Sequence, residues 1–126
     1  MTNLSKRILV VDDAATVRMY HRTILEGAGY AVSEAVNGIE GLEKALSVPY
    51  DLYLVDVNMP KLDGYGFLRA LRAETIAQAP AVMISTESQG RDQTAAFVAG
   101  ANYYLIKPIK PQELLAVCRM LVGAGV

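Results

Sequence analysis

Short apolar runs alternate with segments of helical length along the chain, and this alternation restricts the fold more than any other feature. The runs are four or five residues long, as in ILVV at 8–11 and YYLI at 103–106. Such short, nearly continuous apolar runs are typical of strands that a parallel sheet buries on both faces. Because parallel strands need crossover connections, we predict repeated βα units.

Five βα units fit the chain. The predicted strands cover residues 7–11, 31–35, 51–55, 81–85 and 103–107. The predicted helices cover residues 14–27, 38–46, 65–73, 91–99 and 111–122. Gly27 and Gly29 close the first helix, and Asn37-Gly38 forms a turn after the second strand. The prediction is an α/β fold with one parallel, five-stranded sheet.

The composition predicts one compact domain. The chain has 126 residues, of which 52% are hydrophobic and 20% charged, enough for a sizeable core. Its net charge of −1 argues against a nucleic-acid partner, because such binding needs a basic surface. The single cysteine, Cys118, excludes an internal disulfide and lies in a helical pattern that predicts a buried thiol. No apolar run is long enough for a membrane span or a signal-peptide core, so we expect a cytoplasmic protein.

Polar side chains follow four of the apolar runs at the point where each run ends. Asp12 and Asp13 follow ILVV, Asp56 follows LYLV, Ser85 closes AVMIS, and Lys107 follows YYLI. The carboxyl ends of parallel strands share one edge of an open sheet, where ligands bind, so these groups are expected to converge. Two carboxylates about 4 Å apart repel by roughly 4 kcal/mol at an effective dielectric constant near 20. A cluster of three therefore indicates a cation or a catalytic use.

The paired carboxylates have a structural alternative. Asp13 could cap the following helix, which is a frequent task of Asp before a helix. A cap needs one oxygen, however, and capping does not explain why Asp12 and Asp13 together face the third carboxylate. A hard cation such as Mg²⁺, which takes oxygen ligands, explains the surplus better.

Asp56 and Lys107 carry stronger functional signals. The segment VNMPKLDG after Asp56 cannot begin a helix at once, so capping is a poor explanation. A carboxylate there can act as a nucleophile that takes a phosphoryl group as an aspartyl phosphate. An ammonium group directly after a buried run is costly unless an anion receives it, which favours Lys107 as a phosphate-binding group. Pro108 follows, and the base rate of X–Pro bonds predicts a trans peptide.

The combined motifs VVDD, LVDVNMPKLDG, MIST and IKP resemble the receiver domain of two-component response regulators, over essentially the whole chain. The length is close to that of the stand-alone chemotaxis type. The resemblance implies a flavodoxin-like, doubly wound (βα)5 fold with strand order 2-1-3-4-5. It also implies a single receiver domain, residues 1–126, without an output domain.

The resemblance assigns a role to each site residue. The implied Mg²⁺ ligands are Asp12 (through water), Asp13, Asp56 and the backbone carbonyl of Asn58. Asp56 is the implied phosphoacceptor, Lys107 the phosphate-binding lysine, and Ser85 and Tyr104 the switch pair. Asn58 and Glu87, each two residues beyond a key residue, are expected to tune dephosphorylation by orienting a water molecule.

Three positions depart from the usual pattern of these domains. Thr86 is larger than the residue common at its position and could narrow the space into which Tyr104 turns. Ile109 replaces the aromatic residue often found after the Lys-Pro pair. Tyr103 is a second aromatic beside Tyr104, but strand alternation aims it at the opposite face.

The expected partners are proteins. His21 lies mid-helix without acidic neighbours, so we interpret it as a solvated residue rather than a relay histidine. The phosphoryl group must then come from a sensor histidine kinase or a histidine phosphotransfer protein. The expected output is a protein effector that binds a monomer on the face formed by residues 91–99, 103–107 and 111–122, with chemotaxis-like output favoured.

Several alternatives stay open at this stage. A phosphorelay shuttle or a phosphate sink would need the same pocket. A phosphatase of the haloacid-dehalogenase type would need an Asp-x-Asp motif, whereas Asp12 and Asp13 are adjacent. A flavodoxin would need a Ser/Thr-rich first loop, and a receiver without phosphorylation would not need the complete pocket.

Overall fold

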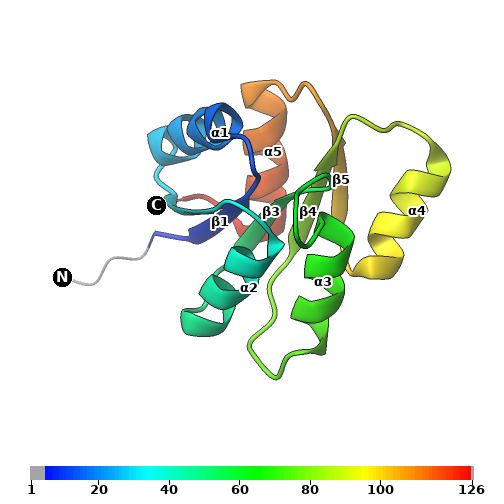
Figure 1. Ribbon diagram of the computed structural model, residues 1–126. Helices are drawn as coiled ribbons and strands as arrows, with labels where there is room; N and C mark the ends of the chain where they lie inside the picture. Colours follow the sequence, from blue (N-terminus) through cyan, green and yellow to red (C-terminus); the bar gives the residue numbers. More distant parts are fainter. Residues whose placement is uncertain (1–4, 126) are drawn as a thin grey trace.

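The computed structural model describes residues 5–125 and contains one parallel sheet (Figure 1). Its strands are β1 (Arg7–Val11), β2 (Ala31–Ala35), β3 (Leu52–Asp56), β4 (Ala81–Ser85) and β5 (Tyr103–Ile106). They are arranged in the order β2-β1-β3-β4-β5, and every neighbouring pair is parallel. This is the flavodoxin-like order, and it places β1 beside β3.

Five helices cover the two faces of the sheet. They are α1 (Ala15–Gly27), α2 (Gly38–Ser47), α3 (Gly64–Ala73), α4 (Gly90–Ala99) and α5 (Pro111–Val122). In Figure 1, α1 and α5 lie together on one side of the sheet, and α2, α3 and α4 lie on the other. No helix within residues 5–125 is long and apolar enough to cross a membrane.

Each face of the sheet has its own apolar core because side chains alternate along the strands. Tyr53 and Met83 point toward α3, whose Phe67 is fully buried against them. On the other face, Leu54 packs in the cluster that contains Leu114 of α5. Strands that are buried on both faces explain the short, nearly continuous apolar runs in the sequence.

Two predictions about individual side chains are confirmed. Tyr104 lies in the core cluster on the α3 and α4 side, whereas Tyr103 is 37% exposed. Cys118 is a buried free thiol in α5, and burial raises its pKa to about 12. Such a thiol is protonated at neutral pH and therefore unreactive.

The predicted element boundaries differ from the observed ones by one residue at most. The third strand was expected at 51–55 and runs from Leu52 to Asp56, because Asp56 still pairs with Ile84 of β4. The fifth strand ends at Ile106, one residue before its predicted end. Four of the helices likewise begin or end within one residue of the prediction, and the last matches it.

Two expectations are wrong. His21 is not solvated, because it lies on the buried side of α1 with 3% of its surface exposed. The Lys107–Pro108 peptide bond is cis rather than trans. The two X–Pro isomers differ by only about 0.5–1 kcal/mol, so a base rate cannot identify the position where the surrounding fold selects the rarer one.

The segment after α5 folds back onto the start of β1. The backbone N–H of Lys6 donates to the carbonyl of Gly125 at 3.1 Å, and the Tyr30 hydroxyl donates to the carbonyl of Gly123 at 2.7 Å. A Cβ atom at Gly125 would lie 2.7 Å from the carbonyl oxygen of Ala28, so only glycine fits there. This contact lies at the amino-terminal edge of the sheet.

Candidate functional site

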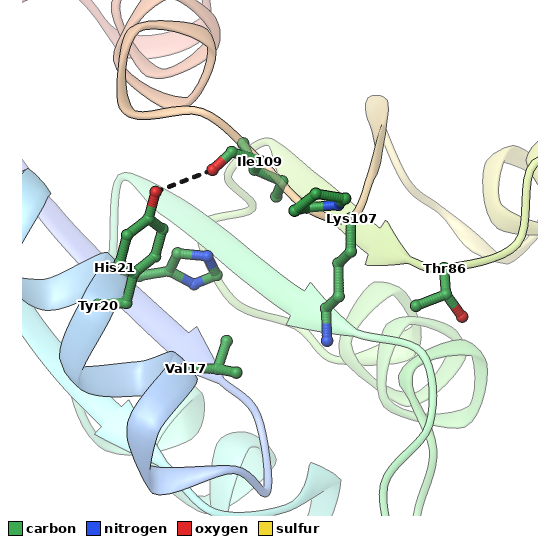
Figure 2. Close-up of a pocket in the computed structure, with 7 residues that line it drawn as sticks. Val17, Tyr20, His21, Thr86, Lys107 and Ile109 are labelled. Atoms are coloured by element: carbon green, nitrogen blue, oxygen red, sulfur yellow. Dashed lines mark hydrogen bonds between the residues drawn. The ribbon is translucent and has the colours of Figure 1, made fainter.

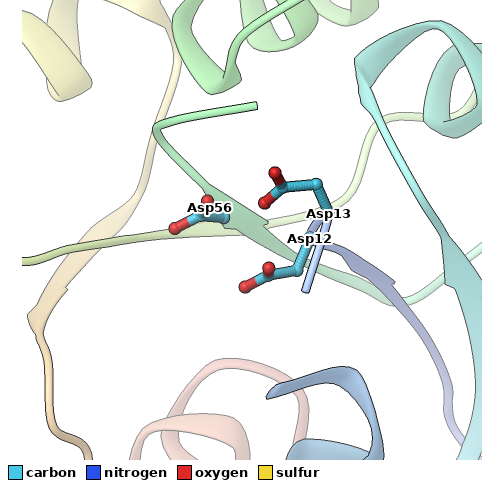
Figure 3. A group of neighbouring side chains, drawn as sticks. All are labelled: Asp12, Asp13 and Asp56. Atoms are coloured by element: carbon cyan, nitrogen blue, oxygen red, sulfur yellow. The ribbon is translucent and has the colours of Figure 1, made fainter. Parts of the chain in front are cut away.

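Three carboxylates meet at the carboxyl edge of the sheet (Figure 3). Asp12 and Asp13 follow β1, and Asp56 ends the neighbouring strand β3. One carboxylate oxygen from each lies within 4.8 Å of the other two. Asp12 and Asp56 are buried and Asp13 is exposed, so the cluster opens to solvent on the Asp13 side.

The geometry does not support a capping role for Asp13. The N-cap residue of α1 is Ala14, which has no side-chain cap hydrogen bond. Asp12 accepts a hydrogen bond from the Ala14 N–H at 2.9 Å through Oδ1. Asp12 therefore stabilises the loop before α1, and the Asp13 carboxylate remains available to the carboxylate cluster.

Lys107 reaches into the cluster from the end of β5. Its Nζ lies 2.8 Å from Asp56 Oδ1 and 3.7 Å from Asp12 Oδ2. Burial disfavours the ammonium, but the hydrogen bond to Asp56 and the charges of Asp56 and Asp12 outweigh it and raise the pKa of Lys107. Lys107 is therefore a permanent cation at the site.

At Asp56, in contrast to Lys107, the effect of burial prevails and sets the direction of the pKa shift. Burial raises the pKa of Asp56 and the charges of Asp12 and Asp13 add to this, while the hydrogen bond and charge of Lys107 oppose it. One ammonium does not neutralise three carboxylates, so the cluster attracts a further cation. The three carboxylates offer oxygen alone, the ligand type that suits a hard cation such as Mg²⁺.

A chain of hydrogen bonds links the end of β4 to β5. The backbone N–H of Glu87 donates to Ser85 Oγ at 3.0 Å, and the Tyr104 hydroxyl donates to the Glu87 carbonyl at 2.7 Å. Ser85 is buried. It ends β4, the neighbour of the strand that ends in Asp56. A change at Ser85 can therefore reach Tyr104 through one residue.

Two exposed side chains in the segments after β3 and β4 belong to Asn58 and Glu87. Asn58 lies two residues after Asp56 in the loop before α3, and Glu87 lies two residues after Ser85. Their exposure leaves both side chains open to solvent.

A cavity of about 440 Å³ lies beside Lys107, between α1 and the loop after β5 (Figure 2). It is lined by Val17, Tyr20, His21, Thr86, Lys107, Pro108 and Ile109. The Tyr20 hydroxyl donates to the Ile109 carbonyl at 3.0 Å and so ties α1 to this loop. His21 Nδ1 is buried without a hydrogen-bond partner among the described residues, and burial lowers the pKa of His21, opposed by Asp12 and assisted by Lys107.

Comparison with known proteins identifies the family. The model of the response regulator receiver domain matches residues 8–119. The chain belongs to the receiver domain family. The chemotaxis protein CheY4 of Vibrio cholerae has the same fold, with a TM-score of 0.88, 32% identity, and coverage of 93% of this chain and 98% of that one.

Two further relatives bear on the site and on the length. The receiver domain of sensor histidine kinase PA1611 from Pseudomonas aeruginosa, described with a magnesium ion in its active-site cleft, has a TM-score of 0.87, 30% identity, and coverage of 94% of this chain and 98% of that one. The transcriptional regulatory protein ResD of Bacillus subtilis is 37% identical over 121 residues, which are 96% of this chain and 49% of ResD. The receiver thus spans about half the length of the curated relatives it matches.

Sequence reasoning missed Arg18, which contacts the backbone of this receiver's carboxylate loop, and Glu34, which binds Arg18. Arg18 of α1 donates from Nη1 to the backbone carbonyl of Asp12 at 2.7 Å and from Nε to Glu34 at 2.9 Å. A signal was present, because Glu34 is a charged residue inside the β2 strand and Arg18 lies one helical turn before Arg22. A sequence pattern gives this pairing only once the register of β1 and β2 is known.

Proposed function

We propose that this receiver accepts a phosphoryl group on Asp56 from a phosphohistidine donor, either a sensor histidine kinase or a histidine phosphotransfer protein. The observation that supports it best is the 2.8 Å contact between Lys107 Nζ and Asp56 Oδ1 inside a cluster of three carboxylates. Asp56, the proposed nucleophile, and Lys107, the proposed phosphate-binding group, are therefore already in contact.

In the transfer, the phosphorus atom exchanges its bond to nitrogen for a bond to oxygen. A carboxylate oxygen of Asp56 forms the new phosphorus–oxygen bond while the phosphorus–nitrogen bond of the donor breaks, and the electron pair stays on the imidazole nitrogen. Lys107 donates to the phosphoryl oxygens as charge builds on them. The receiver therefore catalyses its own modification, although its task is signalling rather than metabolism.

We propose Mg²⁺ as the cofactor. Asp13, Asp56 and the Asn58 backbone carbonyl would bind it directly, and Asp12 would bind it through water. When bound, Mg²⁺ supplies positive charge that offsets the charge of the carboxylates and of the transferring oxygens. The oxygen-only ligand set and the magnesium named for the PA1611 receiver support this choice.

We propose Ser85 and Tyr104 as the switch. The phosphoryl group adds about −1.5 to −2 charge and three acceptor oxygens, which Lys107 and the Ser85 hydroxyl can satisfy. If Ser85 turns toward these oxygens, it weakens the hydrogen bond from the Glu87 N–H and so loosens the Glu87 backbone. Tyr104, which donates to the Glu87 carbonyl, would then follow. These contacts differ between the two states and so shift the equilibrium between them.

The output that we propose is phosphorylation-dependent binding of a protein effector to the face formed by α4, β5 and α5. We propose that the receiver acts as a monomer in the cytoplasm. The full-length match to CheY4 supports a chemotaxis-like output. A phosphorelay shuttle and a phosphate sink are the alternatives. Receivers in longer transcriptional regulators are a further one, supported by the half-length match to ResD.

The acceptor is tested with Asp56→Asn. Asparagine keeps the shape of the side chain but has no nucleophilic carboxylate, so we expect no label from a cognate kinase or from acetyl phosphate, with an unchanged circular dichroism spectrum. Glu43→Gln, which makes the same change at an exposed residue of α2, is the matched control and should label like the wild type. Label that persists in Asp56→Asn would refute Asp56 as the acceptor.

A further inference from the structure

Arg18 is held between the carboxylate loop and the edge strand of the sheet. Its Nη1 donates to the Asp12 carbonyl at 2.7 Å, its Nε donates to Glu34 Oε1 at 2.9 Å, and its side chain is 13% exposed. Two bonds from different nitrogen atoms fix the plane of the guanidinium group. Arg18 is therefore held in one orientation and largely shielded from solvent.

The carbonyl that Arg18 binds belongs to the peptide group between Asp12 and Asp13. A peptide group is planar, so fixing its oxygen restricts the backbone on both sides. The Asp12 N–H is also fixed, because it donates to the Ala35 carbonyl at 3.1 Å. Arg18 thus restrains the peptide unit from which both carboxylates project.

Glu34 holds Arg18 in this place. Its second oxygen accepts from Arg22 Nη1 at 2.8 Å, and its backbone carbonyl accepts from Lys44 Nζ. Glu34 lies opposite Val10 in the pairing of β2 with β1. Val10 precedes Asp12 by two residues, so Glu34 lies close to the carboxylate loop. The hydrogen bond from Arg22 and, against the effect of burial, that from Arg18 lower the pKa of Glu34, so the carboxylate stays charged.

We propose that Arg18, anchored by Glu34, is a positioning residue that sets the affinity of the Asp12 and Asp13 carboxylates for Mg²⁺. This inference rests on the proposed function, since it concerns the ion that the phosphoryl transfer uses. Arg18 binds a backbone carbonyl rather than an ion ligand atom, so it acts through the loop geometry.

Two effects of Arg18 on Mg²⁺ have opposite signs. As a cation near the cluster, Arg18 repels a divalent cation, so removing its charge alone would tighten Mg²⁺ binding. As a positioning residue, it keeps the carboxylates oriented, so removing it would weaken Mg²⁺ binding. The direction of the change therefore separates positioning from a general charge effect.

The test is Arg18→Met, with Mg²⁺ affinity measured by calorimetry and folding measured by urea unfolding without Mg²⁺. We expect the affinity to fall about tenfold, as for other residues that orient metal ligands. Arg22→Met is the matched control, because it removes a like charge and a Glu34 ion pair one turn further along α1, with no contact to Asp12. Its affinity should change less than about twofold, as for an exposed ion pair.

A kinetic measurement adds a second readout. If Arg18 acts through ion binding, Arg18→Met needs more Mg²⁺ for half-maximal labelling by acetyl phosphate but approaches the wild-type rate at saturating Mg²⁺. A purely structural defect would lower the saturated rate as well.

Wild-type affinity in Arg18→Met, tighter binding, or an equal loss in Arg22→Met would overturn the proposal. If Arg18→Met does not fold, Glu34→Ala decides in its place, with an expected fall of roughly threefold or more and wild-type affinity as the contrary result. A wild-type protein that binds no Mg²⁺ would refute the proposed function instead, so the two failures are distinguishable.

Discussion

Single polar residues at the carboxyl edge of the sheet differ in how tightly they are held, and this sets the effect of a substitution. Asp12 is buried and hydrogen-bonded, and Asp56 contacts Lys107. Asn58 and Glu87 are exposed. Substitutions of the exposed pair are therefore expected to change rates without damaging the fold.

Asn58→Leu and Glu87→Leu should lengthen the lifetime of phosphorylated Asp56. If these polar side chains orient the water that hydrolyses the acyl phosphate, apolar replacements remove that orientation. Decay of labelled protein after removal of acetyl phosphate measures the lifetime, and Glu43→Leu controls for an added surface leucine. Unchanged decay in both variants would contradict a tuning role.

His21 makes a prediction about stability and pH. Burial lowers its pKa below the ordinary value near 6.5, so the unfolded chain binds a proton more readily than the folded one. The folded state therefore loses stability as pH falls below about 6.5, by at most about 1.4 kcal/mol for each pH unit. Above that pH, His21 adds no pH dependence to the stability of the folded state.

His21→Leu removes this dependence. Urea unfolding of the wild type and the variant at about pH 7.5 and about pH 5.5 should give a difference in unfolding free energy that favours the variant more at the lower pH. Comparing the two proteins cancels the titration of the carboxylates. An equal difference at both pH values would show that His21 does not titrate in this range.

At the scale of elements, Arg72 joins three segments at the amino-terminal end of β4 and β5. The guanidinium group of this α3 residue donates to the carbonyls of Ala79 and Gly100 and to the side chains of Gln78 and Asn102. Gly100 ends α4 with a φ angle of 122°, which other residues rarely adopt. Arg72 therefore satisfies backbone groups that irregular segments leave without partners.

Arg72→Met should lower the free energy of unfolding by about 2–4 kcal/mol, because it keeps the apolar stem but leaves several acceptors unpaired. Arg69→Met, at an exposed position of the same helix, is the matched control and should change stability by less than about 0.5 kcal/mol. Both values come from urea unfolding. Equal losses in the two variants would mean that the Arg72 hydrogen bonds contribute little.

The elements and the carboxylate edge could be predicted because both depend on local patterns. Strand runs such as LYLV specify where a buried strand ends, and parallel topology then brings the strand ends together. The side of α1 that would bury His21 could not be predicted, since it depends on the cavity between α1 and the Lys107–Pro108 loop. The contact of Arg18 with the Asp12 carbonyl likewise depends on tertiary packing.

At the scale of the whole molecule, the proposed output is the binding of a protein effector. Beryllofluoride mimics the phosphoryl group, so a pull-down with and without it should recover a protein that binds only the activated receiver. Recovery of a motor or chemotaxis component would indicate a chemotaxis-like output, and recovery of a histidine phosphotransfer protein would indicate a phosphorelay shuttle. Recovery of no partner would indicate a phosphate sink. The mass of the receiver in solution under both conditions tests the expected monomer.

The return of Gly125 to the start of β1 has a practical consequence for engineering. The contact between Gly125 and Lys6 lies beside the α1–β2 turn, at the sheet edge opposite Asp56. A fluorescent label attached at this edge of the sheet would lie away from the phosphorylation pocket. An insertion between Val122 and Gly125, in contrast, would detach this segment from Lys6 and Tyr30 and should be avoided.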